Sequence, residues 1–200
     1  MIRLLNKVPN EVTVAVSGGP DSMAGLHFLS QSKRTVQAAF FNHGTEASNK
    51  GEEIVSSFCN LNRIPFVRGS ISSPRTKGSS LEEYWRNQRY EFFESINSPV
   101  ITCHHLDDVL EWWVFSSCHG NPKLIPYSRG KYLRPFILNK KDTMLNWCKD
   151  KDIKYALDPS NEDRIHKRSY IRFEVIPQIL KVNPGLYKVL KKKIVKNYAK

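Results

Sequence analysis

The chain has 200 residues, of which 40% are hydrophobic and 11% aromatic, as expected for one α/β domain with a short appendage. Its net charge of +12 indicates an acidic partner, and nucleic acid is the usual one. The four cysteines contain no Cys-x-x-Cys pair, which argues against a disulfide framework and against a zinc or iron–sulfur site. No long apolar run or signal peptide is visible, so we expect a cytoplasmic protein with no membrane contact.

Strands and helices alternate along most of the chain. The predicted strands are Val12–Val16, Val36–Phe41, Ile64–Val67, Val100–Cys103 and Ile153–Leu157, with an extended segment at Lys131–Pro135. The predicted helices are Asp21–Leu29, Ala47–Asn60, one beginning at the capping boxes of Ser79 and Ser80, Leu106–Cys118, Asp142–Lys149, Arg168–Leu180 and Leu186–Tyr198. This order favours an α/β fold, a doubly wound and mostly parallel sheet with helices on both faces. Ligands bind such sheets at the carboxyl ends of the strands.

We predict that the chain consists of a catalytic domain over residues 1–183 and a basic C-terminal helix over residues 184–200. Residues 160–200 hold eleven lysines and arginines against three acidic residues. We expect RNA contacts from three consecutive lysines of the last helix, Lys191, Lys192 and Lys193. A solvated lysine face, a docking helix or a frayed tail would explain the same pattern.

The turn Ser17-Gly18-Gly19-Pro20-Asp21-Ser22 links a predicted strand to a helix. Its backbone N–H groups and the helix N-terminus favour a phosphate group, and the two glycines allow close approach. Ser17 and Ser22 offer hydroxyls to pyrophosphate oxygens. The turn lacks the lysine of a Walker A loop and the third glycine of a dinucleotide fingerprint. It is similar to the PP-loop of the N-type ATP pyrophosphatases, a fold also described as adenine nucleotide alpha hydrolase-like, and this resemblance implies ATP as a substrate.

A second cluster, His104-His105-Leu106-Asp107-Asp108-Val109-Leu110-Glu111, follows the predicted strand Val100–Cys103. Asp108 and Glu111 are three residues apart and share a helix face. Their carboxylates suit a magnesium ion, a cationic amine or a proton, and His105 suits a phosphate or proton transfer. Acidic residues also occur at helix N-termini for stability alone, and for Asp107 this explanation competes with a catalytic role.

Together these motifs resemble the tRNA(Ile)-lysidine synthetase family. Shorter similarities follow in order along the chain, at Asn42-His43-Gly44, Glu82–Tyr90, Leu133-Arg134-Pro135, Asp158-Pro159-Ser160-Asn161, Arg168–Arg172 and Pro177. The resemblance implies a ligase that adenylates a wobble cytidine with ATP and Mg²⁺, releases pyrophosphate, and joins free lysine to the base with loss of AMP. Its partner would be a tRNA(Ile) with a CAU anticodon.

The resemblance also implies roles for residues. Asp21, His105, Asp108, Glu111, Arg168 and Arg172 would be catalytic, and the ATP-binding set would be Ser17, Gly18, Gly19, Asp21 and Ser22. Asp108 and Glu111 would hold the lysine ammonium, Arg86 and Arg89 would contact RNA or phosphates, and Asp158 and Asn161 would close the site. No metal ligand is assigned. A solvated helix face explains Arg86 and Arg89 equally well, and a capping turn explains Asp158–Asn161. Helical spacing favours packing roles for the aromatic residues Trp85, Phe92, Phe93, Trp112 and Trp113.

The chain departs from the family pattern at Val109, Trp112 and Ser169, which puts fine substrate positioning in doubt. We also expect a short form of the family, without the C-terminal domains that members commonly carry. Two other functions remain open: a different PP-loop enzyme, such as a tRNA sulfur transferase or an amide-forming synthetase, and a non-catalytic RNA-binding derivative. Sulfur transfer generally needs paired cysteines, and only Cys103 follows a strand near the predicted site.

Overall fold

The computed structural model describes residues 1–75, 78, 80–157 and 167–199. Its described strands are β1 (Glu11–Val16), β2 (Thr35–Asn42), β3 (Phe66–Ser70), β4 (Val100–Ile101), β5 (Ser128–Arg129) and β6 (Tyr132–Leu133). Its helices are α1 (Pro20–Ser30), α2 (Glu46–Asn62), α3 (Leu81–Glu94), α4 (Leu106–Cys118), α5 (Lys141–Asp150), α6 (Lys167–Tyr170), the π-helical turn η2 (Ile171–Val175), α7 (Ile176–Val182) and α8 (Leu186–Tyr198).

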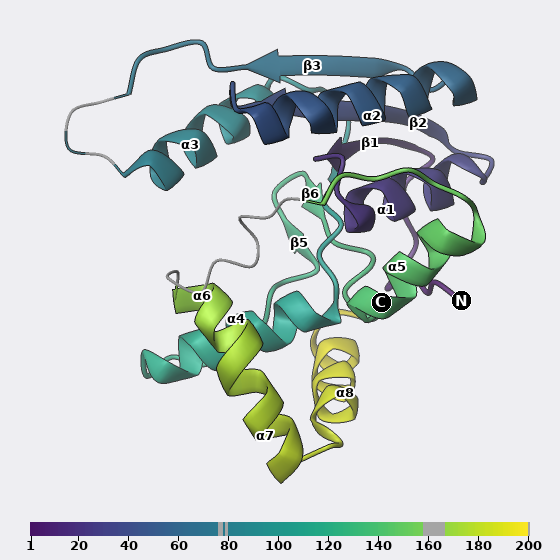
Figure 1. Ribbon diagram of the computed structural model, residues 1–200. Coiled ribbons are helices and arrows are strands. Elements are labelled where there is room, and N and C mark those ends of the chain that lie inside the picture. Colours follow the sequence, from purple (N-terminus) through teal and green to yellow (C-terminus); the bar gives the residue numbers. More distant parts are fainter. Residues whose placement is uncertain (76–77, 79, 158–166, 200) are drawn as a thin grey trace.

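The strands form one sheet in the order β3-β2-β1-β4-β6-β5, which is parallel except for β5 (Figure 1). Alternate side chains of β1 and β2 face opposite sides of the sheet. Val14 and Phe40 enter a core with α1, α2 and α5, whereas Ala15 and Ala39 face α3. The predicted doubly wound sheet is therefore confirmed.

A second core lies beside the sheet and joins α4, α7 and α8 (Figure 1). Leu186, Leu190 and Ile194 of α8 are buried there, so one face of this helix is packed as its spacing predicted. The two chain ends lie close together, since the Asn6 side-chain amide donates to the Tyr198 carbonyl at 2.6 Å. No helix in the described ranges is long and apolar enough to cross a bilayer.

Several boundaries differ from the predictions. The predicted strand at Ile153–Leu157 is wrong: its Ala156 N–H donates to the Gly18 carbonyl at 2.8 Å, so the segment bonds the phosphate turn and joins no strand. β3 begins two residues later than predicted, because α2 closes through a left-handed Arg63. The predicted helix Arg168–Leu180 is interrupted by η2. β5 was not predicted, and it pairs with β6 across a turn at Gly130, whose φ is +57°.

The N-cap half of the capping box predicted at Ser80 is confirmed. The Ser80 hydroxyl accepts from the Glu83 N–H at 3.1 Å and starts α3. Ser79 and Asp158–Asn161 lie outside the described residues. Phe93 is buried against the sheet, and Phe92, Trp112 and Trp113 are partly buried against the cores, in agreement with their expected packing roles. Trp85 belongs to none of the three cores, and its ring lies 5.3 Å from that of His43.

Candidate active site

The phosphate turn connects β1 to α1 and is held by its own serines. The Ser22 hydroxyl accepts from the Ser17 N–H at 3.1 Å and donates to the Gly19 carbonyl at 2.9 Å. The Ser17 hydroxyl lies 3.3 Å from that of Ser22. Pro20 occupies the first position of α1, as predicted, since its missing N–H costs nothing there. Two hydroxyls and the start of a helix therefore meet at one point, which is suited to a phosphate group.

Helix α2 presses its backbone against this turn. Gly18 has φ +81°, and a Cβ added to it would lie 2.7 Å from the Cα of Gly51. A Cβ on Gly51 would in turn lie 2.7 Å from the Ser17 carbonyl oxygen. Sequence reasoning did not identify Gly51 as part of the site. A glycine inside a predicted helix was the available signal, because such residues often mark a close approach of backbones.

His105 joins the phosphate turn to helix α4. Its Nε2 lies 3.6 Å from an Asp21 carboxylate oxygen and its Nδ1 lies 3.5 Å from one of Asp108. Its backbone N–H donates to Asp108 at 2.9 Å, and the Asp108 N–H donates back to Nδ1, so the two residues form a capping box. Burial alone lowers the pKa of His105, but Asp108, Asp21 and Asp107 outweigh it and raise that pKa above its usual value.

The acidic pair predicted on α4 is already engaged by two arginines. Arg168 donates to one Glu111 oxygen at 2.5 Å, and Arg172 donates to the other at 2.8 Å and to Asp108 at 3.2 Å. Glu111 is buried, with 1% of its surface exposed. Burial opposes ionisation of Asp108, yet His105, His104 and Arg172 hold its pKa below the usual value. The structure thus brings all six residues predicted as catalytic into one charged chain, namely Asp21, His105, Asp108, Arg172, Glu111 and Arg168.

The neighbouring Asp107 has a different environment. It accepts from the Lys141 N–H at 2.7 Å and from the Tyr187 hydroxyl at 2.7 Å. These bonds fasten α4 to the start of α5 and to α8. Asp107 also lies 3.6 Å from Nδ1 of His105. It differs from Asp108 in its other partners, because Asp107 holds helices together whereas Asp108 pairs with Arg172.

His104 and Cys103 flank the same strand end and were not assigned roles from the sequence. Burial, together with Arg134, His105 and Arg168, lowers the pKa of His104 to about 4 against the opposing effect of Asp108. Its Nδ1 lies 3.0 Å from the Thr102 hydroxyl. Burial, followed by Asp21, raises the pKa of the Cys103 thiol far above its usual value. The environment of Cys103 is therefore unlike that of a reactive thiolate.

The predicted phosphate contacts lie outside the charged chain. Arg86 lies over the Tyr90 ring at 4.8 Å, and Arg89 is half-buried on the same helix. Lys191, Lys192 and Lys193 are exposed on α8. In the described residues, no ion pair connects these five side chains to the acids of the site.

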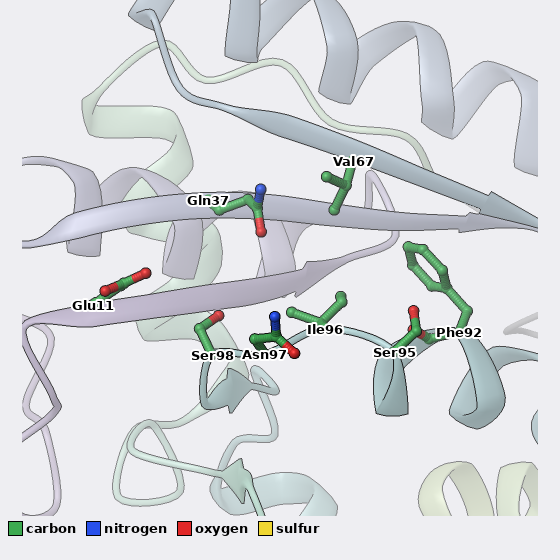
Figure 2. A pocket seen from close by; sticks show the side chains of 8 residues that line it. All are labelled: Glu11, Gln37, Val67, Phe92, Ser95, Ile96, Asn97 and Ser98. Atoms are coloured by element: carbon green, nitrogen blue, oxygen red, sulfur yellow. The ribbon is translucent and has the colours of Figure 1, made fainter.

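A cavity at the opposite edge of the sheet is separate from this site. It measures about 350 Å³ and is lined by Glu11, Gln37 and Ser98 among others (Figure 2). These residues stand at the amino-terminal ends of β1, β2 and β4, whereas the charged chain follows the carboxyl ends. Buried Thr13 bonds both Ser98 and Gln37 there, at 2.6 and 3.1 Å. This cavity is not part of the candidate active site.

Comparison with known proteins agrees with the expected resemblance. The bifunctional protein TilS/HprT of Listeria monocytogenes is 30% identical over 199 residues, covering 89% of this chain and 31% of that protein. The tRNA(Ile)-lysidine synthase of Thermotoga maritima is 30% identical over 190 residues, covering 86% of this chain and 46% of that protein. The chain therefore spans about a third to a half of the curated relatives that it matches.

A solved structure with a similar fold is the NH3-dependent NAD synthetase from Campylobacter jejuni, with a TM-score of 0.51 at 15% identity, covering 96% of this chain and 87% of that one. This likeness concerns the fold alone. The PP-loop domain family matches residues 2–179, a range that contains the phosphate turn and the whole charged chain. The chain therefore belongs to the PP-loop domain family.

Proposed function

We propose that this chain is an ATP-dependent ligase that joins lysine to the wobble cytidine of an isoleucine tRNA with a CAU anticodon. The observation that carries this proposal is His105, which contacts both Asp21 of the phosphate turn and Asp108 of the acidic pair. Activation by a nucleotide and attack by an amine would thus occur beside one another. The similarity to relatives named tRNA(Ile)-lysidine synthase supports the choice of substrate.

The first step needs ATP at the phosphate turn. The cytidine carbonyl oxygen at ring position two attacks the α-phosphorus, and pyrophosphate leaves. Ser17, Ser22 and the backbone of Gly18 and Gly19 would hold the phosphates. Asp21 Oδ1 is buried with no hydrogen-bond partner among the described residues, which fits a carboxylate that awaits Mg²⁺. The ion would neutralise phosphate charge. No described group of three or more acidic, histidine or cysteine side chains could hold it, so phosphate oxygens would complete its coordination.

The second step needs a neutral amine. Lysine would enter as an ammonium ion, which favours the acidic pair of Asp108 and Glu111. Arg168 and Arg172 occupy these carboxylates in the described structure, so the site already accepts cationic nitrogen. Lysine would replace part of these contacts and lose a proton to a carboxylate; its nitrogen then attacks the activated ring carbon, and AMP leaves. The freed arginines would stabilise the phosphate of the leaving group.

A matched pair of aspartate variants tests this proposal. Purified protein is incubated with ATP, Mg²⁺, radiolabelled lysine and bulk tRNA, and label in RNA and pyrophosphate are measured. Asp108→Asn should lose about two to four powers of ten in lysine transfer while ATP binding persists. Asp107→Asn should retain transfer within about tenfold and lose about 1–3 kcal/mol of stability, because it loses hydrogen bonds between helices.

The other outcomes identify the alternatives. Pyrophosphate release with a different acceptor would support another PP-loop enzyme, although the raised pKa of the Cys103 thiol gives sulfur transfer no support. RNA binding that needs no ATP, with no turnover, would support a non-catalytic derivative. Equal loss of transfer in both aspartate variants would contradict the division of roles between Asp107 and Asp108.

A further inference from the structure

Arg134 is a buried cation that the charged chain does not use. It follows β6 directly, and only 7% of its surface is exposed. Its backbone N–H donates to the Tyr127 carbonyl at 2.8 Å and its Nη1 donates to the Pro126 carbonyl at 3.0 Å. Its Nε is buried with no hydrogen-bond partner among the described residues. A buried guanidinium N–H without an acceptor is costly, so this atom indicates a missing anionic or polar group.

The surroundings of Arg134 are cationic and aromatic. Burial is the largest effect that lowers the pKa of Arg134; Tyr90 raises this pKa by its charge and by a hydrogen bond, and Arg129 and Arg86 lower it further. Arg86 lies over the Tyr90 ring at 4.8 Å. Burial lowers the pKa of Arg89, and Arg86 adds a smaller effect in the same direction. Within the described ranges, no salt bridge joins any of these four arginines to a carboxylate. Four arginines that gather without an acidic partner are suited to an anion from outside the chain.

The register of the sheet places this arginine beside the active site. β6 runs parallel to β4, Ile101 pairs with Leu133, and the Thr102 N–H donates to the Leu133 carbonyl at 2.9 Å. Tyr132 faces α3, and side chains alternate along a strand, so Arg134 also projects toward the α3 side. His104 follows β4 at this same edge and has its pKa lowered in part by Arg134. Arg134 therefore lies on the opposite side of β4 from β1 and its phosphate turn. Arg86 and Arg89 lie on α3, which also packs against β2 and β3.

We infer that Arg134, together with Arg86, binds a phosphodiester of single-stranded RNA next to the reactive base. ATP phosphates belong to the turn after β1, so a second anion centre across β4 fits a second phosphate-bearing substrate. Arginine is suited to this task because its planar fork meets two phosphate oxygens at once. Helix α3, which carries Arg86, also carries the aromatic residues Trp85 and Tyr90. Bases stack on such rings in single-strand binding proteins. The inference deepens the proposed function, since it names where the RNA backbone would lie.

The test measures binding apart from catalysis. A fluorescent anticodon stem–loop of an isoleucine tRNA is titrated with the full chain at several salt concentrations, and ATP binding is measured separately by calorimetry. Arg86→Gln changes an exposed side chain and should fold normally, whereas Arg134→Lys keeps the charge and loses the fork. Each should weaken RNA binding by about tenfold, and Arg86→Gln should also reduce the salt slope by about 0.7 to 0.9. Affinity for ATP should stay within about twofold. The double variant should lose less than the product of the single effects, because both residues would hold one phosphate.

Arg63→Gln is the matched control, because Arg63 is an exposed arginine after α2 at the amino-terminal edge of the sheet. It should leave RNA affinity and salt slope unchanged. The inference is overturned if Arg86→Gln behaves like this control, or if ATP affinity falls in place of RNA affinity. Lysine transfer by the wild type is measured in parallel. If RNA binds through this site but no lysine is transferred, only the proposed reaction is refuted. If lysine is transferred and the Arg86 and Arg134 variants bind RNA like the wild type, only the inference is refuted.

Discussion

His104 and His105 are adjacent in the chain, yet their surroundings shift their pKa values in opposite directions. The ring of His105 is surrounded by Asp21, Asp107 and Asp108, which favour its protonated form. His104 is buried beside Arg134 with the effect of Asp108 outweighed, and its pKa falls to about 4. Adjacent residues leaving a strand project to opposite sides, so each meets a different set of charges. The sequence motif identified the pair but gave no means to predict that their pKa values shift in opposite directions.

This difference has a consequence for stability in acid. In the unfolded chain His104 takes up a proton near its usual 6.5, whereas in the folded chain it does so only near 4. The stability that depends on its neutral form is therefore complete above pH 6.5 and is lost as the pH falls toward 4, by roughly 3 kcal/mol. His43 and His27 have lowered pKa values and add to this loss, whereas His105 acts in the opposite direction.

The replacement His104→Gln should reduce the loss of folding stability that occurs as the pH falls. Urea unfolding at a series of pH values between 6.5 and 4 measures the free energy of unfolding for the variant and the wild type. His119→Gln is the control, because that histidine is exposed at the end of α4. Equal pH dependence in all three proteins would mean that His104 is protonated as readily in the folded chain as in the unfolded one.

At the scale of elements, the phosphate turn depends on a helix that the motif does not include. Gly51 lies in the second turn of α2, and its backbone packs against Ser17 and Gly18. The turn is therefore held both by the backbone of α2 and by the hydrogen bond from Ala156. These two contacts come from segments 30 residues or more away along the chain, which is why local motif reading did not find them.

Gly51→Ala should separate α2 from the turn. The added Cβ would lie 2.7 Å from the Ser17 carbonyl oxygen, and relieving such overlap costs about 1–3 kcal/mol. ATP binding should weaken by about tenfold or more, because the turn shifts with the helix. Calorimetric titration with ATP measures the effect. Ser57→Ala, an exposed position of α2, should bind ATP like the wild type. Unchanged binding in Gly51→Ala would mean that α2 moves without the turn.

At the scale of the whole molecule, α8 is both a structural helix and a charged surface. Leu190 and Ile194 are fully buried against α4, while the lysines at 191–193 are exposed. Deleting the end of the chain would therefore remove core residues along with charge. Neutralising the lysines in place is the cleaner test of the predicted RNA contact.

Replacing Lys191, Lys192 and Lys193 together with glutamine should weaken RNA binding without loss of folding. The slope of log affinity against log salt should fall by about 0.7 to 0.9 for each phosphate contact that is lost. A triple variant of equal charge at Lys33, Arg34 and Arg63, at the amino-terminal edge of the sheet, is the control. Equal slopes in the two triple variants and the wild type would identify the α8 lysines as a solvated face.

The local patterns of the sequence determined the sheet, the phosphate turn, the Ser80 cap of α3 and the acidic pair, because each depends on residues within a few positions of one another. The periodicity of strands and helices predicted the fold. The exception is Ile153–Leu157, which was predicted as a strand but forms a hydrogen bond to the phosphate turn. Only the tertiary structure decided the partners of those residues: two arginines on Glu111, Gly51 against Gly18, and Arg134 among other arginines beside His104. Such contacts join elements distant in the chain, and burial together with neighbouring charge, which periodicity does not encode, sets their chemistry.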